Sequence, residues 1–129
     1  MRLIHTLLIL ALCLCLGCSD GTSSDTAPLP TYDFTGTWDG SLTGATTATT
    51  FTMNATQTDA TITGFLFNDA GYTFSMSGYA SGSAITLDGY DTLDPGYTIH
   101  CSGTCDGTYA SGTWYDSFGQ AGVWEAWIR

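Results

Sequence analysis

Apolar and polar residues alternate along the chain from Asp33 onward, with the period of two that is typical of half-buried β-strands. In the first stretch Phe34, Trp38 and Leu42 share one face with two glycines, while threonine, serine and aspartate occupy the other. The same alternation recurs further along, and helical periodicity is absent. We therefore expect eight strands, within residues 34–42, 51–55, 62–66, 72–78, 85–89, 97–101, 110–114 and 122–128.

Turn-forming residues separate these stretches, among them Asp94-Pro95-Gly96 and Asp106-Gly107. Nearly all connections are short, which favours consecutive antiparallel hairpins. A meander of eight strands closes most naturally into an up-and-down barrel, because closure removes the exposed strand edges. The predicted fold is therefore an all-β, eight-stranded antiparallel meander barrel over residues 33–129, with a two-sheet β-sandwich as the alternative.

The first residues have a different pattern. Arg2 is followed by an apolar run over residues 3–16, which is too short to span a bilayer but fits the apolar region of a helical signal peptide. The run ends in Cys15-Leu16-Gly17-Cys18, which resembles the lipobox of bacterial lipoproteins. The resemblance implies cleavage between Gly17 and Cys18 and a lipid on the Cys18 thiol, palmitate being one of its acyl chains. An ordinary secretory signal, or an uncleaved anchor, is the alternative.

A polar segment with two prolines, residues 18–32, then joins the expected lipid to the barrel and is predicted to act as a flexible tether. Ser19 follows the anchor cysteine. In lipoproteins, retention in the inner membrane commonly uses aspartate at that position, so the resemblance implies an outer-membrane location in the cell envelope. The predicted organisation is a signal peptide over 1–17, a lipidated tether over 18–32 and a barrel over 33–129.

Charge excludes two classes of partner. The chain has no lysine, and its basic residues are Arg2 and Arg129. After loss of Arg2 with the signal, twelve acidic residues against one arginine leave the mature part near −11. Nucleic acid and polybasic membrane contacts both require clusters of basic residues, so we expect neither. The chain is nevertheless 43% hydrophobic, which predicts a folded domain rather than a disordered one.

Two cysteines remain for the folded part, Cys101 and Cys105, in an oxidising compartment. On one extended strand their Cα atoms lie about 13 Å apart, whereas a disulfide needs less than about 7 Å. A bond would therefore require a turn at residues 102–104, while the hairpin signal at 106–107 favours one continuous strand. The two alternatives, bonded and reduced, stay open. His100 lies on the opposite face of such a strand, so no metal site is expected.

Catalytic groups are sparse. After signal removal His100 is the only histidine and Glu125 the only glutamate. Cys101 and Ser102, the neighbouring nucleophiles, point to opposite sides of a strand, so a triad with His100 is not expected. We expect neither an enzyme nor a cofactor.

Aromatic residues offer a different kind of surface. If Phe34, Ile62 and Trp114 point inward, alternation directs six others outward, and these could contact a glycan or an envelope protein. The alternative is that they only stabilise the sheet through cross-strand pairs. The six residues are Phe65, Phe67, Tyr79, Tyr109, Tyr115 and Trp127.

The two ends of the barrel sequence carry a second resemblance. Gly36-Thr37-Trp38 in the first strand and Trp127-Ile128-Arg129 in the last resemble the calycins, the group of barrels that includes avidins, lipocalins and fatty-acid-binding proteins. The resemblance implies a closed barrel in which Trp38 packs against Arg129. It also implies an internal pocket for a small molecule.

Bulky residues at inward positions argue against such a pocket, because eight short strands enclose little space. The sequence thus predicts a membrane-anchored envelope lipoprotein whose β-domain is a non-enzymatic binding or structural module. The alternative function is a small-molecule carrier. The inward bulky residues are Trp38, Phe51, Phe74, Met76 and Trp124.

Overall fold

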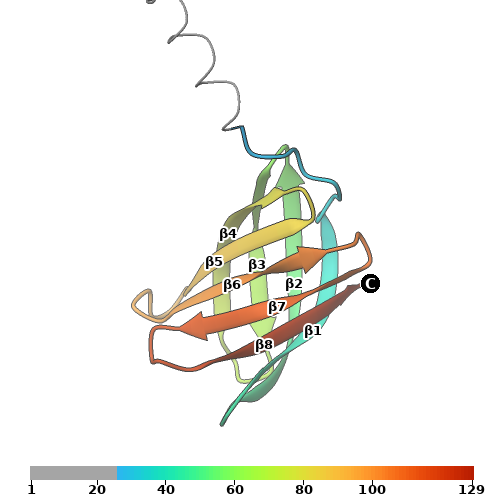
Figure 1. Ribbon diagram of the computed structural model, residues 1–129. Coiled ribbons are helices and arrows are strands. Elements are labelled where there is room, and N and C mark those ends of the chain that lie inside the picture. The colour runs from blue at the N-terminus through green and yellow to red at the C-terminus, as the bar shows by residue number, and fades with distance from the viewer. Residues whose placement is uncertain (1–25) are drawn as a thin grey trace, which may run out of the picture.

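A computed structural model of the chain describes residues 26–129. Gly17, Cys18, the signal peptide and the first part of the tether lie outside these residues. The described part consists of eight strands (Figure 1): β1 Gly36–Gly44, β2 Ala48–Thr58, β3 Thr61–Asn68, β4 Thr73–Ser81, β5 Ala84–Asp91, β6 Thr98–Cys105, β7 Tyr109–Asp116 and β8 Ala121–Ile128. No helix in this part of the chain is long and apolar enough to cross a membrane.

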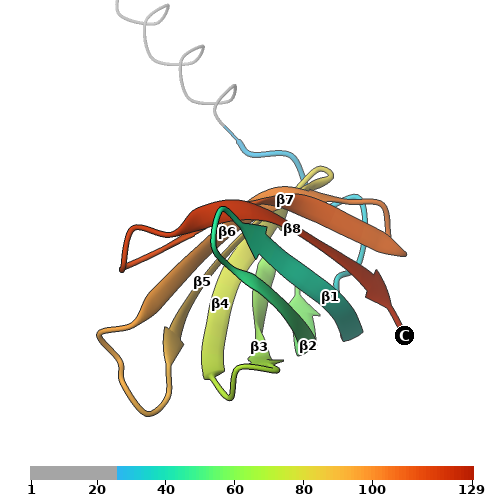
Figure 2. The same cartoon turned by 90° about the horizontal axis from the view of Figure 1, so that it is seen from below.

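Each strand pairs antiparallel with the next, and β8 returns to pair with β1. Register across this closing pair runs from Trp38 opposite Ile128 to Gly44 opposite Gly122. Figure 2 shows β1 lying between β2 and β8 at the closure. The predicted eight-stranded meander barrel is therefore confirmed, and the sandwich alternative is wrong, because no sheet edge is left open in the described residues.

The interior is built from the predicted alternation. Every second side chain points inward, and the buried set includes Trp38, Ile62, Leu66 and Phe74, each 2% exposed or less. Buried indole N–H groups need acceptors, and they find them on the backbone: Trp38 donates to Phe34 O at 2.9 Å and Trp124 to Ser102 O at 3.2 Å. Within residues 26–129 every buried side-chain nitrogen and oxygen has a hydrogen-bond partner, and the buried residues are apolar except for Asp91 and Asp116.

Inward-facing glycines allow the strands to coil tightly. A Cβ atom on Gly78, Gly112 or Gly122 would lie 1.8 Å from a carbonyl oxygen of the neighbouring strand. Such close backbone approach is available only to glycine and is typical of sharply curved strands. It brings the walls close enough together for the large side chains to fill the barrel.

Residues 28–34 run along one end of the barrel and form hydrogen bonds with it. Gly82 in the β4–β5 turn accepts a hydrogen bond from Thr31 N at 2.8 Å, and its own N–H donates to Leu29 O at 3.0 Å. Phe34, which follows this segment, is buried in the core. The end of the expected tether is thus packed against the end of the barrel that carries the β2–β3, β4–β5 and β6–β7 turns.

Candidate functional site

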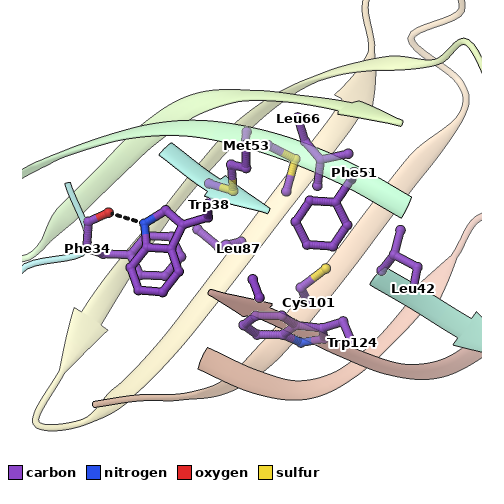
Figure 3. A pocket seen from close by; sticks show the side chains of 11 residues that line it. Phe34, Trp38, Leu42, Phe51, Met53, Leu66, Leu87, Cys101 and Trp124 are labelled. Carbon is purple, nitrogen blue, oxygen red and sulfur yellow. Dashed lines mark hydrogen bonds between the residues drawn. The ribbon is translucent and has the colours of Figure 1, made fainter. Parts of the chain in front are cut away.

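The barrel interior is filled. Figure 3 shows the side chains of Phe34, Trp38, Phe51 and Trp124 among those that surround the space at its centre. The cavity left between them is about 10 Å³ and is lined only by apolar groups and the Cys101 thiol. That is room for one water at most, far below the several hundred Å³ of a ligand pocket. Within the described residues, the inside of the barrel is a core.

Both thiols of the folded part point into this core. Cys101 and Cys105 lie on one strand, β6, and both are free and buried. Burial raises the pKa of Cys101 to about 12. It also raises that of Cys105, whose sulfur accepts a hydrogen bond from Gly107 N at 3.3 Å. The strand runs straight through residues 102–104, so the turn that a disulfide requires is not there, and neither thiol is activated as a nucleophile.

The expected packing of Trp38 against Arg129 is wrong. Trp38 lies inside, where its ring stacks on Phe34 at a centroid distance of 4.5 Å. Arg129 lies outside and binds the next residue of β1, Asp39, with its Nε 2.9 Å from Oδ2 and one terminal nitrogen 2.8 Å from Oδ1. Neighbouring residues of a strand point to opposite faces, so an arginine that reaches Asp39 cannot stack on Trp38.

The predicted outward aromatic residues are on the outer wall, but they do not form one cluster. Tyr109 is half-buried against Trp127, with centroids 5.1 Å apart, and Phe65 stacks on Phe67 at 6.5 Å. The others are exposed at separate positions around the barrel. The exposed members are Phe65, Phe67, Tyr79, Tyr115 and Trp127.

His100 also lies on the outer wall. Its ring stacks on Tyr115 at 4.8 Å, and its Nδ1 is 2.5 Å from a carboxylate oxygen of Asp88 on β5. Among residues 26–129 no hydroxyl or thiol forms a hydrogen bond to His100, and no group of three histidine, cysteine or acidic side chains lies close enough to hold a metal.

A groove crosses the wall where β8, β1, β2 and β3 lie side by side. The strand register sets one row of outward side chains across it, with Trp127 opposite Asp39, Asp39 opposite Thr52 and Thr52 opposite Phe67. We call this feature the outer-wall groove; it is a shallow hollow that is open to solvent along the wall. Its ends are aromatic, Trp127 and Phe67, and its polar floor comprises Asp39, Ser41, Thr50, Thr52, Asn68 and Asp69.

The two carboxylates of the groove are held in place and ionised. Hydrogen bonds from Arg129 and from Thr52, the latter at 2.8 Å, keep the pKa of Asp39 below its usual value. The hydroxyl of Thr49 does the same for the pKa of Asp69, which also accepts from Thr50 Oγ1 at 3.2 Å. The floor thus presents fixed acceptors beside threonine hydroxyls, with one of its two negative charges compensated by an arginine.

The aromatic ends of this groove were predicted from the sequence, and its polar floor was not. Alternation directs Asp39 and Thr52 outward, so part of the floor had a signal, whereas the position of Asp69 depends on the β3–β4 turn. Another missed residue is Tyr90, which is half exposed and lines a separate groove with Phe65. Its outward direction also follows from alternation along β5.

Comparison with known proteins bears on the fold. No protein family and no curated protein matches the chain. A solved structure of a redesigned beta barrel, mFAP1, bound to DFHBI, is similar, with a TM-score of 0.53 and 14% sequence identity over 74% of this chain and 94% of that chain. At this identity the similarity concerns the barrel fold alone.

Proposed function

We propose that this chain is a non-enzymatic envelope lipoprotein, anchored through Cys18, whose barrel binds a partner with its outer wall. One observation carries the proposal: the interior has room for no ligand, while the outer wall presents exposed aromatic residues beside a shallow polar groove. Exposed aromatic rings with polar neighbours are typical of recognition surfaces.

The anchor suits this use of the outer wall. Nine residues separate Cys18 from Pro28, whose carbonyl accepts a hydrogen bond from Ser81 Oγ at the barrel end that carries the β4–β5 turn. That length allows at most about 35 Å between the lipid and the barrel. A barrel attached by one end keeps the strands of its wall accessible to material in the surrounding envelope.

A small-molecule carrier is the second candidate, because the similar barrel mFAP1 is bound to DFHBI. A carrier of that kind would have to open a space where Trp38, Phe51 and Trp124 now meet. Titration of the full chain with an apolar fluorescent dye separates the two functions. Saturable dye binding that survives removal of the outer-wall aromatic residues would favour the carrier.

Anchoring is tested in cells. The full chain should fractionate with membranes and carry acyl chains on Cys18 by mass spectrometry. A Cys18→Ser variant should lose both properties. An unacylated full-length chain in the wild type would contradict the anchor.

Outer-wall binding is tested with purified full chain in detergent, incubated with isolated peptidoglycan sacculi, which offer no bilayer for the expected lipid to enter. The variant Trp127→Ala/Phe67→Ala should lose co-sedimentation. The matched control, Tyr79→Ala/Tyr115→Ala, removes two somewhat more exposed rings outside the outer-wall groove and should retain co-sedimentation. Equal binding by both double variants would contradict a role for the outer-wall groove.

A further inference from the structure

We infer that the outer-wall groove binds a neutral glycan, with sugar rings against Trp127 and Phe67 and sugar hydroxyls on the carboxylates of Asp39 and Asp69. This inference rests on the proposed function and names the chemical class of its ligand. It is drawn from three properties of the groove, which are its aromatic ends, its acceptor-rich floor and its charge.

The aromatic ends match the apolar faces of sugars. A pyranose ring turns C–H groups toward one or both faces, and these pack on the negative face of an aromatic ring. Trp127 and Phe67 are each about half exposed, so both retain free ring surface. Three inter-strand steps separate them along the row, about 14 Å at about 4.8 Å each. The groove therefore suits a short oligosaccharide.

The floor matches the hydroxyl groups. An ionised carboxylate is an acceptor only, with about four lone-pair directions. In Asp39, three of these lone-pair directions accept hydrogen bonds, from Thr52 and from two nitrogens of Arg129. In Asp69, two accept hydrogen bonds from threonine hydroxyls. The remaining lone pairs can accept hydrogen bonds from sugar O–H groups. The existing bonds hold both carboxylates in fixed positions, which lowers the entropy cost of binding.

Charge narrows the class to neutral ligands. The chain contains no lysine and carries a formal charge of −10, so an anionic glycan would be repelled. A cationic peptide is the competing occupant. It is less suited to the outer-wall groove because Arg129 already compensates Asp39. The closed barrel also offers no unpaired strand edge in the described residues to which a peptide strand could add.

Tryptophan fluorescence tests the inference, because only one of the four tryptophans is exposed. Trp38, Trp114 and Trp124 are buried, so acrylamide quenching of the full chain reports mainly on Trp127. The probes are chitotriose, cellotetraose and maltotetraose, with a tetralysine peptide as the cationic competitor. At least one oligosaccharide should protect Trp127, with a dissociation constant of roughly millimolar for so open a site.

Two variants and a control locate the binding. Phe67→Ala should weaken it roughly tenfold through the lost ring contact, and Asp39→Asn should weaken it by a similar factor through the lost charged acceptor. Tyr79→Ala, an exposed ring outside the groove, should bind like the wild type. Because a neutral sugar forms no ion pair with the groove, binding should also be nearly independent of salt concentration. Circular dichroism checks that each variant is folded.

The outcomes separate the inference from the function on which it rests. Absence of protection by every oligosaccharide overturns the inference. So does protection by tetralysine that disappears with salt, which would identify a cationic occupant. In either case, loss of envelope co-sedimentation in Trp127→Ala/Phe67→Ala would leave the outer-wall function standing. Failure of both measurements would overturn both.

Discussion

Replacing Phe34 with alanine should lower the free energy of unfolding by about 4 kcal/mol. Phe34 precedes β1, yet its ring is 2% exposed and stacks on Trp38 at 4.5 Å. Phenylalanine-to-alanine changes in a core cost about 3–5 kcal/mol, and the lost ring stacking contributes roughly 0.5–1.5 kcal/mol of that. The Phe34 carbonyl, which accepts the Trp38 indole N–H, remains. The variant therefore loses only the contacts of the ring that closes one end of the barrel.

Urea unfolding monitored by tryptophan fluorescence measures this cost. For a slope of about 2 kcal/mol/M, a loss of about 4 kcal/mol moves the midpoint down by roughly 2 M. Phe65→Ala, which removes an exposed ring, should cost less than about 1 kcal/mol. Arg129→Ala should cost equally little, because its ion pair with Asp39 is on the surface. A cost above about 3 kcal/mol for Arg129→Ala, with less than about 1 for Phe34→Ala, would refute this account of the barrel end.

Three further predictions concern the core and the turns. Cys101 and Cys105 should resist a thiol reagent at pH 8 in the native protein and both react in denaturant, since burial raises the pKa of each; rapid native labelling would contradict this. Hydrogen bonds from backbone N–H groups in the β6–β7 turn hold the pKa of Asp106 below its usual value of 3.8. The ionised Asp106 therefore stabilises the fold fully above pH 3.8, and this stabilisation is lost as the pH falls through the lowered pKa. Asp106→Asn should flatten this part of an acid-unfolding curve, and an unchanged curve would refute the assignment. Gly112→Ala should lower the free energy of unfolding by more than about 4 kcal/mol, because its Cβ would lie 1.8 Å from a carbonyl oxygen of β6. In the control Gly96→Ala the atom nearest to the new Cβ is 3.4 Å away, so stability should change little. Thermal or urea unfolding measures both.

The strand pattern was predictable because it depends on local alternation. Inward positions such as Trp38, Ile62 and Leu66 are buried as the period of two requires. Element ends were less predictable. Tyr72 was expected in a strand but precedes β4, where it packs on Tyr97 at 5.1 Å. Contacts between loops decide such boundaries, and alternation along one strand carries no information about them.

The outer-wall groove was only partly predictable, because it depends on how the barrel closes. Alternation directs Phe67 and Trp127 outward, but they lie 60 positions apart in the sequence. They frame one groove because β8 pairs with β1 in a register that sets Trp127 opposite Asp39. The same register explains the failed Arg129 prediction. A shift of one residue along β1 exchanges the inner face for the outer face, and Arg129 reaches the outward Asp39 instead of the inward Trp38.

The small side chains of the inward glycines explain both the filled core and the aromatic rings exposed at the outer-wall groove. Glycines at inward positions such as Gly112 bring neighbouring backbones together, and the narrowed barrel is then filled by Phe34, Trp38 and Trp124. With the inside occupied, rings that alternate outward remain partly in water, and Trp127 is half exposed where a core tryptophan would be covered. Hydration of such rings is unfavourable, and a sugar face that displaces this water recovers part of that cost. The fixed carboxylates of Asp39, opposite Trp127, and of Asp69, near Phe67, then select for ligands that bring hydroxyl donors to the groove.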